Sequence, residues 1–346
     1  EELGYHNKSY SSWGGNVVQD SNTGEFHLFA SQMVLHCELG DYGSNSEIIR
    51  ATATSGAAGP FSYQQSIIAP FAHNPTIRAL PNRTGFVLYM IGGNKQTPKN
   101  CSNESTSAPF STTSGLFGSG ISVSFSTNLT GPWSTPVEVN FTDQSPILFN
   151  GGTNPSPHIH ADGSVSLAFQ MHPNASRERG WEMVGIAHAS SYLGPFTYNT
   201  PNPISPSNPL CIAGKEEDPF LWLSPRGYHI ITHGMCPTGV FQAHYRFSED
   251  GVTWYQSPRQ TYDYTIEFTN GSTHTFARVE RPQLYFDMHD AVTGTFSNPS
   301  VLYNGVCNGL ACLGNGKLGK TFTLARKIKQ TTDLQQITYA KKHNKT

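Results

Sequence analysis

The chain has 346 residues, a formal net charge of −2 and only 13% charged residues. A chain without a basic stripe lacks the surface that nucleic acids and anionic membranes bind, so we expect neither as a partner. No apolar run reaches the ~18 residues that a membrane-spanning helix needs. The 33 glycines, 23 prolines and 12% aromatic residues are typical of an all-β protein rich in turns.

The first predicted element is a hairpin near the N-terminus. A strand over Trp13-Gly14-Gly15-Asn16-Val17-Val18 leads through a turn at residues 22–24 to a second strand over Phe26-His27-Leu28-Phe29. The pattern of strand, turn and strand recurs, now with proline near the start of the first strand. The later copies open at His73-Asn74-Pro75, Asn154-Pro155-Ser156, Glu216-Glu217-Asp218-Pro219 and Glu280-Arg281-Pro282.

A second repeat alternates with the first. A strand of small residues is followed by a Gly-Pro turn and an aromatic residue, which we expect to pack between neighbouring sheets. The turns lie at Gly59-Pro60-Phe61, Gly131-Pro132-Trp133 and Gly194-Pro195-Phe196, with a variant at Asp250-Gly251-Val252-Thr253-Trp254. A fifth outer strand is predicted over residues 320–325.

Together the two repeats predict five units, spaced by about 60 to 80 residues, which is longer than the usual propeller blade but fits four strands with long loops. We therefore expect a single all-β domain over residues 1–346, a five-bladed β-propeller of four-stranded antiparallel blades. The blades are expected to start near residues 13, 73, 153, 217 and 280, and a short basic tail to occupy about 335–346.

Glycosylation signals and cysteines indicate the compartment. Asn-x-Ser/Thr occurs at Asn7, Asn82, Asn100, Asn103, Asn128, Asn140, Asn174, Asn270 and Asn344, mostly in predicted turns. The alternative is that loops rich in Ser, Thr and Asn contain such triplets by chance. Six cysteines, an even number, favour disulfides and a secreted, extracellular glycoprotein.

The six cysteines can be paired by position. Cys307 and Cys312 would close a small loop, and Cys211 and Cys236 flank the acidic hairpin, which leaves Cys37 with Cys101. No Cys-x-x-Cys occurs, which argues against a zinc site built on thiolates.

The strand openings predict one pocket, because the first strand of each propeller blade lines a central channel. We expect no required cofactor or protein-bound metal, although a calcium ion in the channel stays open. The candidate catalytic residues are Glu217, Glu280 and Asp218, and the candidate substrate-binding residues are Trp13, Asn16, His73, Asn74, His158, Glu216, His233 and Arg281.

The acids carry the chemistry in this hypothesis. Three adjacent carboxyls in a confined site cannot all ionise freely, so at least one should have a raised pKa and act as an acid near neutral pH. Arg281 is either a clamp for a substrate carboxylate or an ion-pair partner of Glu280. Trp13 either stacks on a sugar or belongs to the core. His158 and His160 alternate on one strand, but no third metal ligand is fixed by their spacing.

With its five units, proline-ended openings and Gly-Pro-aromatic turns, the chain resembles the five-bladed β-propeller glycosidases, above all glycoside hydrolase family 43 and its relatives. The resemblance covers roughly residues 12–330. It implies that Glu217, which is separated from Pro219 by one residue, is the general acid. The positions of the family's two aspartates are held by Gly14-Gly15-Asn16 and Asn74-Pro75-Thr76. The resemblance therefore leaves the second carboxyl to Glu280 or Asp218.

Three hypotheses follow for the function. The first is a glycosidase that removes terminal sugars from a polysaccharide or a glycoprotein glycan, with Glu217 as the acid. The second is a polysaccharide lyase on a uronic-acid glycan, with His73, His158 or Tyr89 as the base and Arg281 or a histidine as the carboxylate neutraliser. The third is a carbohydrate-binding propeller without catalysis. All three predict an oligosaccharide or polysaccharide partner, and we expect a monomer.

Overall fold

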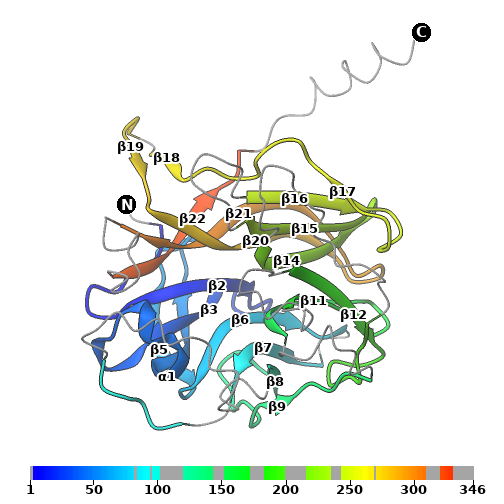
Figure 1. Cartoon of the computed structure of the whole chain (residues 1–346), viewed down its shortest axis with the longest axis horizontal. Helices are drawn as coiled ribbons and strands as arrows, with labels where there is room; N and C mark the ends of the chain where they lie inside the picture. Colours follow the sequence, from blue (N-terminus) through cyan, green and yellow to red (C-terminus); the bar gives the residue numbers. More distant parts are fainter. Residues whose placement is uncertain are drawn as a thin grey trace, which may run out of the picture.

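The computed structural model describes residues 3–81, 84–93, 96–101, 120–142, 152–171, 183–198, 216–234, 243–268, 270–308 and 320–329. In this part of the chain, five four-stranded antiparallel sheets surround a common axis as the blades of a propeller (Figure 1). This confirms the predicted fold class.

The first four blades follow chain order from the axis outward, with their first strands in contact around the centre. They comprise β2 (Ser12–Gln19), β3 (Phe26–Met33), β4 (Ser46–Ala53) and β5 (Ser62–Ile68); β6 (Ala72–Ala79), β7 (Phe86–Gly92), β8 (Ile121–Ser126) and β9 (Val137–Glu138); β10 (Thr153–Ile159), β11 (Val165–Met171), β12 (Met183–Ala189) and β13 (Thr197–Tyr198); and β14 (Glu216–Ser224), β15 (Gly227–Gly234), β16 (Ala243–Ser248) and β17 (Tyr255–Gln256).

The fifth blade closes the ring with both ends of the described chain. Its strands are β20 (Arg278–Asp290), β21 (Thr295–Cys307), β22 (Thr321–Lys327) and, outermost, β1 (Gly4–Tyr5). The predicted outer strand corresponds to β22, which pairs with β1 through Gly4 and Leu324. The sequence patterns did not foresee β1, because a two-residue strand has no periodicity.

Short elements decorate the blades. A separate hairpin of β18 (Thr265–Glu267) and β19 (Thr273–Thr275) lies between blades 4 and 5 in the chain, and η1 (Val34–His36), η2 (Leu39–Asp41) and α1 (Tyr42–Asn45) follow β3. Among the described residues, no helix is long and apolar enough to cross a membrane.

The five inner strands share one irregularity near their start. Each loses its regular register with the second strand of its blade within three residues of the opening. One residue at each irregularity has a positive φ: 59° at Gly14, 51° at Asn74, 52° at Asn154, 55° at Asp218 and 56° at Arg281. Proline, or Gly15 in blade 1, follows it. The repeated bulge re-aims the side chains at the five openings, as bulges near functional sites commonly do.

The aromatic residues of the Gly-Pro turns pack between blades, as the sequence predicts. Phe61 contributes to a core shared by blades 1 and 5, Trp133 packs on the core between blades 1 and 2, and Phe196 lies in the core between blades 2 and 3. The hydrophobic core is thus divided into layers between sheets, which is typical of a propeller.

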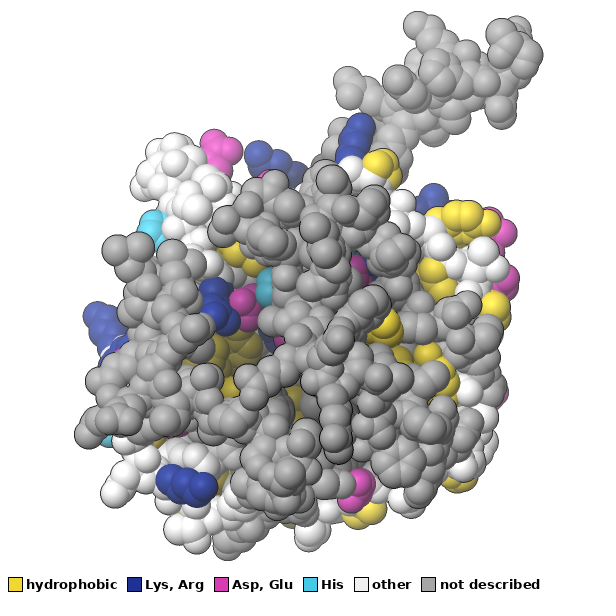
Figure 2. Space-filling model, viewed as in Figure 1, with side chains coloured by type: hydrophobic (Ala, Val, Ile, Leu, Met, Phe, Trp, Pro, Cys, Tyr) yellow, Lys and Arg dark blue, Asp and Glu magenta, His cyan; other side chains and the backbone are white. Residues whose placement is uncertain are grey.

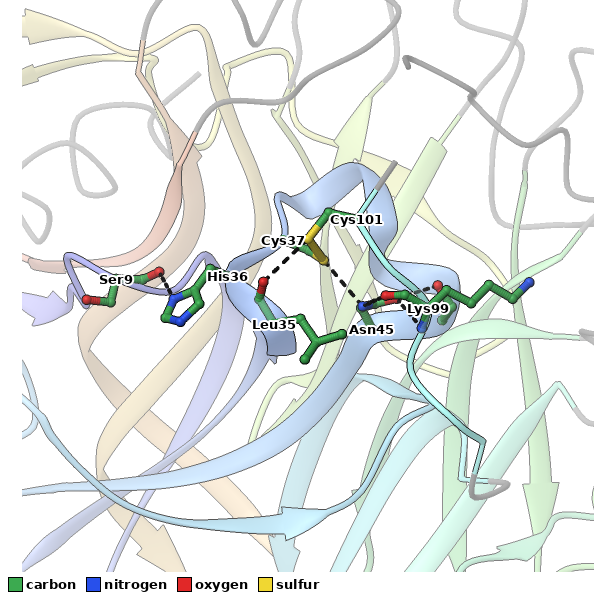
Figure 3. Close-up of a disulfide and its surroundings, with 8 residues drawn as sticks. Ser9, Leu35, His36, Cys37, Asn45, Lys99 and Cys101 are labelled. Carbon is green, nitrogen blue, oxygen red and sulfur yellow. Dashed lines mark hydrogen bonds between the residues drawn. A yellow bond between two sulfur atoms is a disulfide. The ribbon is translucent and has the colours of Figure 1, made fainter. Parts of the chain in front are cut away.

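A disulfide joins Cys37 to Cys101 and ties the segment after β3 to the segment after β7 (Figure 3). The Asn45 side chain supports the connection, because its amide donates to the Lys99 carbonyl at 2.7 Å. This pairing confirms the one predicted by elimination. Cys307 is also disulfide-bonded. The other predicted pairs involve Cys211, Cys236 and Cys312, which lie outside the described residues, as does the predicted tail.

Candidate functional site

The opening of blade 4 places two neighbouring glutamates on opposite sides of β14. The side chain of Glu216 lies inside the blade, where the Arg246 guanidinium and His244 bind both of its oxygens. The side chain of Glu217 lies at the mouth of the channel and is 19% exposed. Alternation along a strand therefore separates a structural acid from an accessible one.

His233 on β15 lies directly opposite Glu217, because the two residues are register partners. Its Nδ1 lies 3.1 Å from Oε1 of Glu217, and its Nε2 lies 3.0 Å from the hydroxyl of Tyr264, just before β18. The imidazole thus donates from Nδ1 to the carboxylate, while the tyrosine fixes the ring from the other side. The three side chains form one hydrogen-bonded chain that begins at the mouth.

The surroundings raise the pKa of both titratable groups, and only that of Glu217 comes close to neutral pH. Burial and the neighbouring Asp218 carboxylate raise the pKa of Glu217 to about 7. Burial alone would lower the pKa of His233, but Glu280 and the hydrogen bond to Glu217 raise it to about 9. At pH 7 the imidazole is therefore charged, while Glu217 is protonated in about half of the molecules.

Glu280 of blade 5 completes the acidic cluster. Its side chain is 12% exposed and lies 3.5 Å from the Arg278 guanidinium. One ligand atom from each of Glu217, Asp218, His233 and Glu280 can be chosen so that all lie within 4.8 Å of one another. Near the middle of this face, acidic, basic and histidine side chains gather beside hydrophobic ones in a hollow (Figure 2).

Such a donor set resembles a divalent-cation site, but its chemistry fits a proton-sharing cluster better. A metal needs the neutral imidazole as its ligand. Here Nδ1 of His233 already faces the Glu217 carboxylate, and the raised pKa of His233 keeps a proton on the ring. In this arrangement both imidazole nitrogens are engaged, Nδ1 by Glu217 and Nε2 by the Tyr264 hydroxyl.

Beneath the mouth, a buried ion pair forms the floor of the site. Arg281 donates its backbone N–H to Asp218 Oδ2 at 3.1 Å and its Nη1 to Oδ1 at 3.4 Å, and its Nη2 donates to the Asn74 carbonyl at 2.9 Å. The Asn74 amide in turn donates to the Asn154 side chain at 2.7 Å. A Cβ at Gly14 would lie 2.6 Å from Arg281 Cγ, so only glycine leaves room for this arginine.

This floor changes the roles expected of two residues. Arg281 is 1% exposed and already holds Asp218 and a carbonyl, so the structure does not place it as a clamp for a substrate carboxylate. Its partner is Asp218 rather than Glu280. Asp218 is 3% exposed and paired, which leaves Glu280 as the second accessible carboxylate beside Glu217.

Two other candidates lie at the strand openings of blades 1 and 2, but both are buried. Trp13 is 4% exposed and packs against Gly305 between blades 1 and 5, which corrects the sugar-stacking hypothesis. His73 is buried under Tyr42 and shares a hydrogen bond with Ser46, and burial lowers its pKa to about 3. Neither residue is placed to touch a substrate at the mouth.

Asn16, His158 and Glu216 also have structural surroundings. Asn16 Oδ1 accepts the backbone N–H of Ile77 at 3.0 Å and so joins blades 1 and 2. His158 is fully buried near the end of β10, far along the strand from the opening at Thr153. Glu216 is saturated by Arg246 and His244, as described above. All three side chains are buried in these surroundings, whereas the sequence hypothesis has them bind substrate.

Sequence reasoning missed two residues of the site. Tyr264 follows a segment without a strand-opening pattern, and Arg278 precedes the Glu280-Arg281-Pro282 opening by two positions. Both reach the acidic cluster only because blades 4 and 5 are adjacent in space. Tyr264 is identified only by the hydrogen bond between its hydroxyl and His233, and Arg278 only by its proximity to Glu280.

The fold and this ring of strand openings define the class as five-bladed β-propellers with a polar mouth. Scans against models of protein families and against curated protein sequences find no match. Solved structures match nearly the whole chain. A family 117 glycoside hydrolase from the marine bacterium Zobellia galactanivorans is 15% identical, with 98% of this chain and 96% of that chain covered and a TM-score of 0.61.

Two fungal proteins show the same likeness. An α-L-arabinofuranosidase from Podospora anserina, in complex with cellotriose, is 11% identical with 95% of each chain covered and a TM-score of 0.62. An exo-β-1,3-galactanase from Phanerochaete chrysosporium, with β-1,3-galactotriose, is 11% identical, with 92% of this chain and 61% of that chain covered and a TM-score of 0.52. The resemblance in fold to propeller glycosidases is thereby confirmed.

Proposed function

We propose that the protein is a glycoside hydrolase whose active site is the mouth formed by blades 4 and 5. The observation that carries this proposal is the placement of Glu217. It is an accessible carboxyl at the convergence of the five inner strands, its pKa is raised to about 7, and a second carboxyl lies close by. A glycosidase requires one carboxyl that holds a proton and one that is ionised. The three fold neighbours reported above are named as glycoside hydrolases or enzymes that cleave glycans, and they support the same proposal.

Glu217 is the general acid in this mechanism. Its proton passes to the glycosidic oxygen as the bond to the anomeric carbon breaks. His233, charged and hydrogen-bonded to Glu217, orients the carboxyl and stabilises the carboxylate that remains. The position of Glu217, one residue before Asp218-Pro219, is the one that the family 43 resemblance implies for the acid.

Glu280 is the second carboxylate. Asp218 is held by Arg281 beneath the surface, whereas Glu280 reaches the mouth and is 12% exposed. A carboxylate beside the scissile bond stabilises the oxocarbenium-like transition state, and it can either activate water or attack the sugar. Because the ligand atoms of Glu217 and Glu280 lie within 4.8 Å, the pair is closer than the ~6.5 to 9.5 Å typical of inverting enzymes.

The substrate class that suits this mouth is a neutral oligosaccharide or polysaccharide. The cluster brings three carboxylates together, and among the described residues the buried Arg281 guanidinium is already paired with one of them. A sulfated or uronic substrate would be repelled by the remaining acids. Cellotriose and β-1,3-galactotriose, the ligands of two fold neighbours, are neutral as well.

The side chains named for the lyase hypothesis are buried or already paired in the described structure. His73, at the opening of blade 2, is 4% exposed, and His158 is fully buried near the far end of β10. Tyr89 is also buried, and its hydroxyl donates to the Tyr192 carbonyl at 2.6 Å. Arg281 is engaged by Asp218. The third hypothesis, a carbohydrate-binding protein without catalysis, would be supported if no substrate were turned over.

A digestion experiment tests the proposal. Wild type and Glu217→Gln are incubated with a panel of neutral and uronic polysaccharides, and reducing ends and ultraviolet absorbance are measured together. Glu249→Gln, an exposed carboxylate of the same blade, is the matched control. We expect new reducing ends without absorbance from wild type and the control but not from Glu217→Gln. An unsaturated product would contradict hydrolysis, and an active Glu217→Gln would contradict the assignment of the acid.

We further propose a secreted, glycosylated monomer that needs no cofactor. The sequon residues Asn100, Asn128, Asn140 and Asn270 are exposed, and the Cys37–Cys101 disulfide suits an oxidising compartment. Enzymatic removal of N-glycans from protein secreted by eukaryotic cells should lower its mass. Unchanged mass would contradict glycosylation, and light scattering tests the monomer.

A further inference from the structure

At the end of the channel opposite the mouth, Arg78 on β6 lacks a counter-ion. Its Nε donates to the Pro157 carbonyl at 2.8 Å, and its Nη1 donates to the Ile77 carbonyl at 2.9 Å and to Asn16 Oδ1 at 3.1 Å. The Phe220 ring lies 5.1 Å from its guanidinium carbon. Among the described residues no carboxylate forms an ion pair with Arg78, and its Nη2 has no hydrogen bond.

The charge on Arg78 persists despite its surroundings. Burial lowers the pKa of its guanidinium to about 9, which still leaves it protonated at neutral pH. Carbonyl oxygens satisfy its donors in part, but they carry no net charge. Arg78 is partly buried, and a cation withdrawn from water without an anion is costly, so such groups are normally paired.

His158 on β10 provides a second, independent sign of a ligand. It follows Pro157, whose carbonyl binds Arg78, and it is fully buried. Neither of its ring nitrogens has a hydrogen-bond partner in the described structure. A buried imidazole without any partner is rare, because a neutral ring carries both one donor and one acceptor. The unused donor lies beside an unpaired cation.

Other described groups around this place are histidines whose pKa values burial lowers, so they supply no negative charge. The His160 ring lies 4.7 Å from that of His158, and His289 on β20 is close enough to influence both His158 and Arg78 electrostatically. The nearest acids act on the outer histidines: Asp162 on His160 and Asp290 on His289. Their carboxylates are essentially exposed to solvent.

The chemistry of the missing partner follows from these charges. A cation would be repelled by Arg78, whose charge influences His158. Water would satisfy the imidazole but would leave the guanidinium charge unbalanced. The aromatic rings of Phe220 and Phe296 flank the place, which favours a small, weakly hydrated ion over sulfate or phosphate.

We propose that a small monovalent anion, chloride in ordinary solution, binds between the Nη2 group of Arg78 and the imidazole of His158. This site is separate from the mouth and does not depend on the proposed hydrolase activity. An ion bound only by the folded chain stabilises the fold in proportion to the logarithm of its concentration. The site therefore makes the stability of the propeller depend on chloride.

The first test measures melting temperature at constant ionic strength while sodium gluconate is replaced by sodium chloride. For wild type we expect the melting temperature to rise by roughly 2 °C for each tenfold increase in chloride above the dissociation constant. Arg78→Met keeps the aliphatic stem and removes the charge, so its melting temperature should not respond. Arg226→Met, which removes an exposed cation from the turn between β14 and β15, should respond like wild type.

The second test does not depend on any variant folding. Wild-type crystals are grown in sodium bromide, and anomalous scattering locates the bromide. We expect a peak between Arg78 and His158 together with the chloride-dependent melting. Water at that place, or bromide at surface cations alone, would overturn the proposal. A bromide peak without chloride-dependent melting would indicate an adventitious ion only and would overturn it equally.

Discussion

Replacing Glu217 by glutamine removes one proton donor and changes little else. The amide has the shape of the carboxyl and can still accept from His233 Nδ1, so the fold should be preserved. General acid catalysis contributes typically 10²- to 10⁴-fold, and we expect kcat on an oligosaccharide to fall within that range. The loss should be large because a sugar alkoxide leaves poorly without a proton.

The leaving group separates this role from a structural one. A dinitrophenyl glycoside needs almost no protonation to depart, so Glu217→Gln should cleave it at a rate close to that of wild type. The assay compares kcat for both substrates in wild type, Glu217→Gln and the Glu249→Gln control. Equal losses on both substrates would refute the assignment of Glu217 as the acid, because a distorted site would slow both.

The pH profile gives an independent measure of the same group. Glu217 must be protonated to act, and burial and Asp218 raise its pKa to about 7. Activity on the oligosaccharide should therefore be retained below pH 7 and fall about tenfold per unit above it, so that about 1% remains at pH 9. In Glu217→Gln this limb should vanish. A wild-type profile that stays flat from pH 6 to pH 9 would contradict the argument.

Further predictions concern the neighbours of Glu217. His233→Gln removes the imidazolium that lowers the pKa of Glu217, so the alkaline limb should move to higher pH, whereas a purely structural role would lower activity equally at every pH. Glu216→Gln should lower the free energy of unfolding by about 3–5 kcal/mol in a urea titration, because it leaves Arg246 buried without its charge partner. Since the Arg246 guanidinium and His244 outweigh burial and hold the pKa of Glu216 at about 2, its stabilisation is present above about pH 4.5 and is lost toward pH 2, and the variant should lack this loss. The short spacing of Glu217 and Glu280 predicts a first product of retained anomeric configuration by NMR; inversion would show that the resting separation does not set the mechanism. Dialysis against EDTA should leave activity unchanged, and activity restored only by a divalent cation would overturn the proposal that no cofactor is needed.

The blades could be predicted from the sequence because their signals are local. Alternating side chains, two-residue turns and Gly-Pro-aromatic corners each act over fewer than about ten residues, and they recur with the blade. The strand openings near residues 13, 73, 153, 217 and 280 all lie in inner strands of the structure. The same local signal identified Glu217 as a distinctive carboxyl, because it lies at a strand opening followed by proline.

The roles within each opening could not be predicted in the same way. Glu216, Glu217 and Asp218 are neighbours in sequence, yet one lies inside the blade, one at the mouth and one in the floor. Strand alternation and the bulge at Asp218 decide this division, and both depend on how β14 sits against its neighbours. Arg281 lies in the floor because Gly14 of another blade leaves space for its side chain. No local sequence pattern indicates that these two residues meet.

The sequence by itself therefore determined the class of fold and the five segments from which a site is built. Only the tertiary structure decided which side chains are accessible, which charges neutralise each other and which pKa values shift. The physical reason is that periodicity acts between adjacent residues, whereas burial and Coulomb interactions at the channel depend on atoms from different blades. Tyr264 beside His233, and Arg78 beside His158, come together only when the ring closes.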